Sequence, residues 1–298
     1  MASLKEIRSR ITSILSTQQI TRAMKMVSAA KLRKAQDAII RMRPYAQKLN
    51  GIMANVAANL PDDASNPFAV TREPKKVLII AVTSDRSLCG AFNSNIIRTV
   101  NNLMIGPYAA QLAAGNVSLL TVGRKGNEYF GRRLTKNLNG DFTGLFGALN
   151  FEQAKTAAEF AMEGFLKGEF DRVELIYNEF KNVATQIIRT QQLLPIAAVK
   201  AETPAIAAAS KVDYIFEPSA EYLLNELIPQ SVKIQFYKAL LESNASEHGA
   251  RMTAMDKATE NAGDLLKELK LTYNRSRQAS ITKEILEIVG GAEALGKG

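Results

Sequence analysis

Histidine and cysteine are almost missing from this sequence of 298 residues, which has one of each, His248 and Cys89. A single cysteine cannot form a disulfide within the chain, and such usage is typical of a reducing compartment. We interpret Cys89 as a small buried apolar residue and His248 as a packed residue of a helix. The sequence therefore offers no Ser-His-Asp triad, Cys-His pair or zinc site.

Phosphate-binding glycine loops are missing as well. Residues 291–298 satisfy most of a phosphate-loop pattern, but Gly298 stands where that pattern requires Ser or Thr. Gly140, Gly144 and Gly147 have the wrong spacing for a dinucleotide fingerprint and indicate a mobile loop. We predict that the chain is not itself an enzyme and has no cofactor or metal.

Long apolar runs do not occur, although hydrophobic residues make up 46% of the chain. A membrane-spanning helix needs about 18 or more consecutive apolar residues, and no such run is present. The first ten residues, MASLKEIRSR, also lack the apolar core of a signal peptide. We expect neither a transmembrane segment nor a secretion signal.

Positive charge is concentrated in the first 50 residues. This segment has eleven Lys or Arg and two acidic residues, so it carries the whole formal net charge of +9. The other 248 residues hold 27 charges of each sign. An element this basic implies an acidic partner along it.

The same segment shows the period of a helix. Ser3 and Glu6 form a capping box, in which each side chain satisfies a free backbone amide. Apolar residues then recur at spacings of three and four, with no proline before Pro44. This pattern predicts one helix of about 40 residues, kinked at Pro44, and Pro61 to Pro67 predicts a loop.

The middle of the chain changes from a helical period to short apolar runs rich in β-branched residues, which are typical of buried parallel strands. We predict strands at 77–83, 117–122, 173–177 and 185–189, the last two paired as a hairpin-like edge. Helical patterns fall between them at 92–113 and 150–167. Alternating strands and helices predict an α/β domain over residues 75–195, followed by an alanine-rich connector at 201–210.

The C-terminal part returns to one long helix, expected from Gln230 to Val289 with a bend at Pro229. Apolar and small residues step four, three, four, three from Leu241 to Tyr273, which indicates a coiled-coil seam. A domain of this size cannot cover such a long helix, so we expect the two chain ends to cover each other. The predicted fold is an antiparallel coiled coil (1–60 and 211–298) with an inserted Rossmann-like α/β domain (75–195).

Three segments resemble the gamma subunits of F-type, rotary, proton-translocating ATP synthases. They are residues 7–35, with Thr-Gln-Gln-Ile-Thr-Arg-Ala-Met-Lys-Met-Val at 17–27; residues 84–93, Ser-Asp-Arg-Ser-Leu-Cys-Gly-Ala-Phe-Asn; and residues 273–292, with Ile-Thr-Lys-Glu-Ile-Leu-Glu-Ile-Val-Gly-Gly-Ala at 281–292. Residues 246–256 are similar too. Ser87 departs from the family, which usually has Gly there, and this puts the geometry of that turn in doubt. The absence of paired cysteines excludes the thiol-switched chloroplast version.

The resemblance implies a central-stalk rotor that couples proton flow through a membrane ring to ATP synthesis or hydrolysis in the catalytic head. The implied partners are the alpha and beta subunits of the head, the epsilon subunit and the proteolipid c-ring. The implied location is the cytoplasmic face of a bacterial inner membrane, peripheral to it through the ring.

The resemblance also implies two sets of interface residues. Those at the catalytic head are Met24, Lys25, Arg251, Arg277, Gln278 and Thr282. Those near the ring and the epsilon subunit are Arg43, Tyr45, Tyr214 and Glu217. For each charged residue the alternative is a solvated helix face.

Two other functions fit parts of the sequence. A basic helix could follow nucleic-acid phosphates, but its charges are interleaved with an apolar seam, and Tyr45 is the only aromatic residue before Phe68. A structural coiled-coil tether would not explain the inserted α/β domain. We therefore expect no nucleic-acid partner.

Overall fold

The computed structural model describes residues 3–58, 67–134, 137–196 and 220–296. The chain divides into two compact units, one formed by residues 1–28 with 252–298 and the other by residues 29–251. Two long helices run through both units, α1 (Leu4–Ala58) and α7 (Ala220–Gly296). The predicted loop at 61–67, except for its last residue, and the connector at 201–210 lie outside the described residues.

Both terminal helices are longer than the sequence pattern predicts. Helix α1 has 55 residues and includes Pro44, and α7 has 77 residues and includes Pro229. The Ser3 half of the predicted capping box is present, because Glu6 N donates to Ser3 Oγ at 3.2 Å, whereas the Glu6 carboxylate accepts from Arg10 Nη2 at 2.8 Å. Both prolines lie within helices. Packing along a long helix outweighs the single backbone hydrogen bond that each proline removes.

In the unit formed by residues 1–28 and 252–298, α1 and α7 pair in antiparallel orientation. Thr21 Oγ1 lies 2.8 Å from Thr259 Oγ1, and Lys25 Nζ lies 2.5 Å from Asp256 Oδ1. Moving towards the chain start on one helix therefore moves towards the chain end on the other. Few side chains are buried in this unit, among them Ile7, Met255 and Ala262. Threonine and charged side chains cross the seam, and the predicted antiparallel pairing is confirmed.

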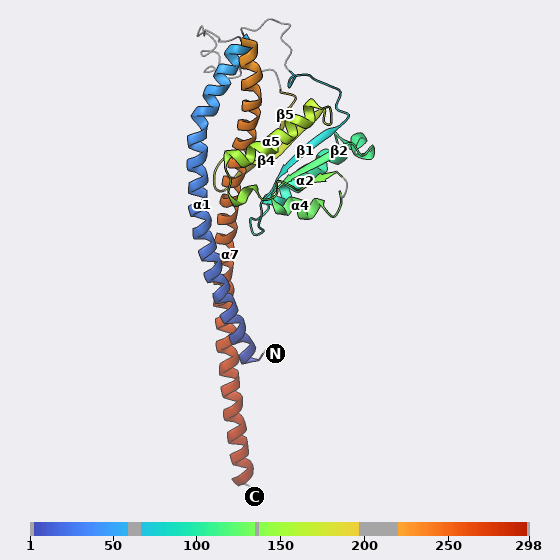
Figure 1. Cartoon of the computed structure of the whole chain (residues 1–298). Helices are drawn as coiled ribbons and strands as arrows, with labels where there is room; N and C mark the ends of the chain where they lie inside the picture. Colours follow the sequence, from blue (N-terminus) through green and yellow to red (C-terminus); the bar gives the residue numbers. More distant parts are fainter. Residues whose placement is uncertain (1–2, 59–66, 135–136, 197–219, 297–298) are drawn as a thin grey trace. The chain divides into compact units, whose positions relative to one another are not determined.

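In the unit formed by residues 29–251, a five-stranded sheet lies beside the paired helices (Figure 1). Its strands are β1 (Val77–Val82), β2 (Val117–Val122), β3 (Leu138–Asn139), β4 (Arg172–Phe180) and β5 (Gln186–Leu194). Their order is β3-β2-β1-β4-β5. Neighbouring strands are parallel except β4 and β5, which form the predicted antiparallel edge. All six residues of β1 are buried because both faces of the sheet are covered.

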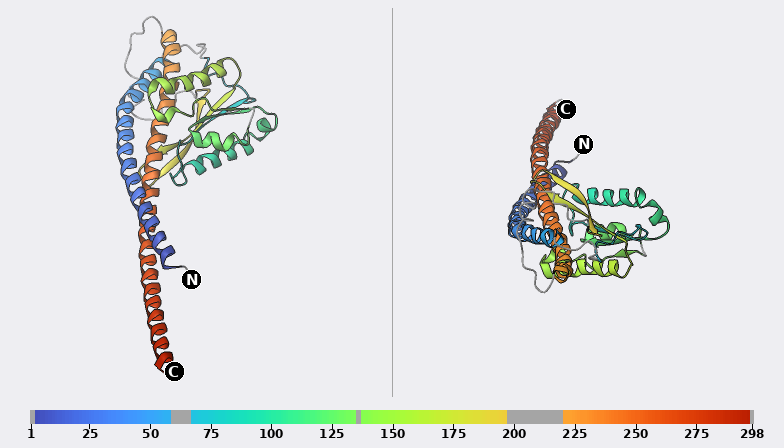
Figure 2. Two further views of the ribbon diagram at one scale, coloured as in Figure 1. Left: turned by 60° about the horizontal axis from the view of Figure 1, so that its bottom comes forward. Right: turned by 90° about the horizontal axis from the view of Figure 1, so that it is seen from above.

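Helices cover the two faces of the sheet separately, as the two views of Figure 2 show. Leu78, Ile80 and Val82 face α5 (Phe151–Leu166) together with parts of α1 and α7. Val77 and Ile79 face the opposite cluster, which contains buried residues of α2 (Phe92–Ile105) and α4 (Arg124–Phe130). Alternate residues of one strand thus belong to two cores, which is the period-two geometry of a sheet.

The predicted α/β organisation is confirmed, with differences in short elements. The expected helix at 92–113 is broken into α2 and the short α3 (Ala109–Ala113). Helix α4 and strand β3 were not predicted because both are too short to show a period. The glycine-containing loop at 140–147 includes the 3-10 turn η1 (Leu145–Gly147).

Candidate functional site around Arg251

The loop that follows β1 occupies the switch point of the sheet. Strand β1 has β2 on one side and β4 on the other, and the chain runs from β1 towards β2 before it returns to β4. In open α/β sheets, ligands bind outside the carboxyl ends of the strands at such a point. The loop at 83–91 is therefore the place where a ligand crevice would be expected in this fold.

Side chains of the loop hold it in a fixed shape. Ser84 Oγ donates to the carbonyl oxygen of Arg86 at 2.7 Å and accepts from Asn93 Nδ2 at 2.7 Å. Ser84 N donates in turn to Asn93 Oδ1 at 2.9 Å. Leu88 adopts a φ of 67°, a conformation that non-glycine residues rarely take. Strained backbone of this kind persists only where its surroundings determine it strongly.

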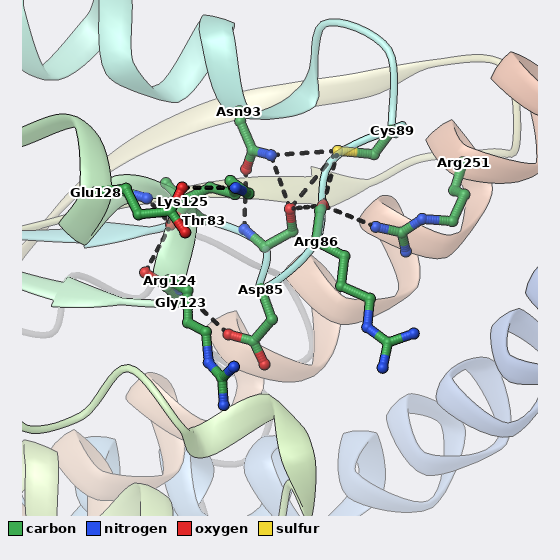
Figure 3. A network of polar contacts seen from close by, with 12 residues as sticks. Thr83, Asp85, Arg86, Cys89, Asn93, Gly123, Arg124, Lys125, Glu128 and Arg251 are labelled. Carbon is green, nitrogen blue, oxygen red and sulfur yellow. Dashed lines mark hydrogen bonds and ion pairs between the residues drawn. The ribbon is translucent and has the colours of Figure 1, made fainter.

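Arg251 of α7 fills the space beside this loop (Figure 3). Its Nη2 donates to the carbonyl oxygens of Arg86 at 3.0 Å and Ser87 at 3.4 Å, and its Nη1 donates to Glu247 Oε1 at 2.5 Å. Arg251 is 8% exposed and Glu247 is 6% exposed. A buried arginine with its charge matched and its donors used is a stable arrangement, whereas either partner alone would be costly. Arg251 therefore fastens α7 to the sheet.

A second contact places α7 across the carboxyl end of β4. Ser246 Oγ donates to the carbonyl oxygen of Asn178 at 3.0 Å. Gly249 lies so close to Phe180 that an added Cβ would be 3.4 Å from the ring. Helix α7 thus covers the ends of both strands at the switch point. The chain's own helix thus fills part of the space that binds ligands in other doubly wound folds.

The neighbouring loop after β2 is packed against the same strand ends. Gly123 has a φ of 95°, and a Cβ there would lie 2.0 Å from the carbonyl oxygen of Thr83. Thr83 Oγ1 accepts from Gly126 N at 2.9 Å, and Asp85 Oδ1 accepts from Arg124 N at 3.2 Å. Only glycine allows the two loops to approach this closely. The network in Figure 3 is therefore a structural junction.

Burial sets the protonation of the titratable groups at this junction. Burial raises the pKa of the Cys89 thiol, so the sulfur stays protonated and unreactive near neutral pH. Burial, with the positive charges of Arg251 and Lys31, lowers the pKa of His248 to about 4. Burial also raises the pKa of Glu247, and Arg251 opposes that change. No group here is poised as a nucleophile or base, and in the described ranges no cluster of His, Cys, Asp or Glu could hold a metal ion.

The residues expected at the catalytic head fall in different places. Arg251 belongs to the junction, and its guanidinium contacts its own chain. Lys25 pairs with Asp256 across the helix seam, beside the half-buried Met24. Arg277, Gln278 and Thr282 are exposed on α7, where Thr282 Oγ1 donates to the Gln278 carbonyl oxygen at 3.0 Å. Their contacts with the head stay predictions.

The second predicted set is only partly described. Arg43 and Tyr45 are exposed on α1. Tyr214 and Glu217 lie outside the described residues. Sequence reasoning missed Glu247, although its spacing of four residues from Arg251 is the spacing of a helical ion pair. The two carbonyl oxygens that bind Arg251 left no signal in the sequence.

Comparison with known proteins places the chain in a family. The family model described as ATP synthase matches residues 3–295. The ATP synthase gamma chain of Cytophaga hutchinsonii is 61% identical over 295 residues, and that of Flavobacterium johnsoniae is 54% identical, each match covering 99% of both chains. The chain belongs to the ATP synthase gamma chain family. It is a non-catalytic subunit of that enzyme complex, the rotor subunit of its central stalk.

Solved structures agree with this assignment. A chain in the central stalk/c-ring structure of the Tetrahymena thermophila mitochondrial ATP synthase is 30% identical, with a TM-score of 0.56, and the match covers 80% of this chain and 99% of that one. A chain in the Euglena gracilis OSCP/F1/c-ring structure is 21% identical, with a TM-score of 0.68 over 98% of this chain and 94% of that one, and supports the fold alone. No described helix of this gamma chain is long and apolar enough to span a membrane.

Proposed function

We propose that this gamma chain couples proton flow through a proteolipid c-ring to ATP synthesis and hydrolysis by rotating inside a head of alpha and beta subunits. The observation that carries the proposal is the unpaired end of α7. Thr21 lies opposite Thr259, so at equal rise on both helices the first residue of α1, Leu4, lies opposite residue 276. Helix α7 then continues to Gly296, about 30 Å further at 1.5 Å per residue.

This free end is not built to stand alone in water. Among its residues Ile281, Ile285, Leu286, Ile288 and Val289 are 47–71% exposed. Five large apolar side chains on one isolated helix indicate that another surface encloses them. A single helix also presents different side chains on each side, so surrounding subunits would bind it unequally. Unequal binding is what allows a rotor to shift their conformations in turn.

Directional contacts with the head are assigned to Arg277, Gln278 and Thr282, at the start of this free end. Within the described part of the chain, the Arg277 guanidinium has no acidic group within ion-pairing distance. Its donors, and the amide of Gln278, are therefore available to a partner. The final residues are mostly small or apolar and suit a surface that slides past many positions. Lys25 and Met24 complete the proposed head-facing set, whereas Arg251 is buried at the junction and is left out of it.

A second surface, which includes Arg43, Tyr45, Tyr214 and Glu217, is proposed to meet the c-ring and the epsilon subunit. The exposed ring of Tyr45, at 56%, supports this assignment on α1. The similar Tetrahymena thermophila chain comes from a structure of a central stalk with a c-ring. We propose that this gamma chain also meets a c-ring, and that it lies at the cytoplasmic face of a bacterial inner membrane, peripheral to it through the ring.

The test compares two changes at the free end in reconstituted vesicles under the same proton gradient. Arg277→Ala with Gln278→Ala is expected to slow ATP synthesis more than tenfold, because each lost charge-assisted bond costs about 1.5–3 kcal/mol. Deletion of residues 291–298 is expected to leave synthesis largely intact. Lys267→Ala, an exposed change on the paired part of α7, is the control. A truncation more damaging than the double substitution would show that the tip grips the head and would overturn the assignment.

A further inference from the structure

A cavity of about 280 Å³ lies where α1, β4 and α7 meet, in the unit formed by residues 29–251. It is separate from the junction at Arg251. All three elements contribute to its walls. The lining residues are Ile39, Met42, Arg43, Ala46, Gln47, Glu179, Phe180, Lys238, Leu241 and Glu242. Its volume lies just below the range of about 300–1,000 Å³ seen for ligand pockets, so it suits only a small molecule.

Glu242 gives this cavity an unusual wall. The residue is 9% exposed, and its Oε2 is buried without a hydrogen-bond partner. Its Oε1 lies 3.7 Å from Lys238 Nζ, which is longer than a hydrogen bond. A buried carboxylate normally accepts several hydrogen bonds, because leaving it without them is costly. The carboxyl group of Glu242 therefore retains capacity to accept hydrogen bonds from a donor.

The other charged groups that line the cavity are either already paired or more exposed to water than Glu242. Glu179 is already bound by Arg189, whose Nε lies 2.5 Å from Glu179 Oε2. Arg43 is exposed, and the Lys238 side chain is 54% exposed, so water and salt screen both positive charges. The Glu242 side chain is only 11% exposed, so its charge is screened least. Glu242 is therefore the charged group of the lining that a ligand inside the cavity would meet with the least screening.

We propose that this cavity binds a small organic cation, a primary ammonium group on a short apolar body. The ammonium would donate to the Glu242 carboxylate, and the apolar body would lie against Met42, Phe180 and Leu241. A small anion would face the buried carboxylate and would be repelled. A neutral molecule of the same shape would fill the space but bring no positive charge to Glu242.

Such a ligand would contact both long helices and the sheet at once. Because it would bind only where the three elements are assembled, it would stabilise the folded unit by mass action. This inference is independent of the proposed coupling role, since it needs neither the head nor the ring.

The experiment uses the purified full chain and two probes of equal shape, phenethylammonium and phenethyl alcohol, titrated by calorimetry at pH 8 in low salt. The ammonium probe is expected to bind at least tenfold more tightly than the alcohol. Glu242→Gln is expected to remove this preference while leaving the alcohol affinity unchanged. Glu260→Gln, an exposed change on the same helix, should leave both affinities at the wild-type values.

A second variant tests the location by volume rather than charge. Ala46→Leu is expected to fill part of the cavity and to weaken both probes at least tenfold. Circular dichroism and thermal unfolding would show whether Glu242→Gln folds. Because Ala46→Leu keeps every charge in place, it tests the location of the ligand even if Glu242→Gln does not fold. Equal affinity of the wild-type chain for the two probes, or undiminished binding of the ammonium probe to Glu242→Gln or Ala46→Leu, would overturn the proposal.

Discussion

His248 makes the stability of the Arg251 junction depend on pH. Its side chain is 8% exposed, and its Nδ1 is buried without a hydrogen-bond partner. Burial, with the nearby charges of Arg251 and Lys31, lowers its pKa from 6.5 to about 4. The folded protein therefore resists a proton that the unfolded chain accepts below pH 6.5.

The size and sign of the effect follow from linkage. A depressed pKa gives stability that is fully present above the unfolded value and is lost as pH falls through the folded value. At about 1.4 kcal/mol per pH unit, the shift corresponds to roughly 3–4 kcal/mol, lost between pH 6.5 and pH 4. His248→Gln has no such group, so its free energy of unfolding should not show this component. Urea unfolding of both proteins at several pH values isolates the difference from carboxylates that titrate in the same range.

A direct measurement is available because the chain has a single histidine. Its Cε1–H proton gives one resonance in a proton NMR spectrum, and the midpoint of the pH titration of that resonance is expected near pH 4. A midpoint near 6.5 would show that the ring is hydrated and that the burial argument is wrong. If the free energy of unfolding of His248→Gln falls by the same amount between pH 6.5 and pH 4, the pH dependence does not come from His248.

Two further predictions each test one contact, the first in the unit formed by residues 29–251 and the second in the other unit. Arg251→Ala should lower the free energy of unfolding by about 3–5 kcal/mol, because it leaves the Glu247 carboxylate buried and unpaired; Arg251→Lys should recover only part, and a loss below about 1 kcal/mol in urea unfolding would contradict the clamp. Thr21→Cys with Thr259→Cys, in a Cys89→Ala background, should form a disulfide within one chain on mild oxidation. Non-reducing electrophoresis that shows only crosslinks between chains would contradict the antiparallel seam.

Much of the fold could be predicted because it depends on local patterns. Spacings of three and four residues mark long helices, and apolar β-branched runs mark buried strands. Strand β2 was predicted at its observed bounds, Val117–Val122. The helix lengths were underestimated. The first helix was predicted with about 40 residues and a kink at Pro44, and the last from Gln230 with a bend at Pro229, whereas tertiary packing carries both helices past these prolines.

The candidate site could be predicted only in part. Arg251 was selected from the sequence, but for a contact with another subunit. Its observed partners are carbonyl oxygens of Arg86 and Ser87, the first of which is 165 positions away in the chain. Backbone carbonyls are present at every residue, so nothing in the side-chain pattern marks the two that Arg251 reaches.

The sequence by itself determined the helices, the alternation of strands with helices, and the family. Only the tertiary structure decided which charged residues are buried. Glu247 and Glu242 are both buried, although each lies four residues from a basic residue of α7, Arg251 and Lys238, and pairs at this spacing usually lie on solvated helix surfaces. The periodicity of a helix fixes which side chains share a face, but the burial of that face depends on distant segments that fold against it.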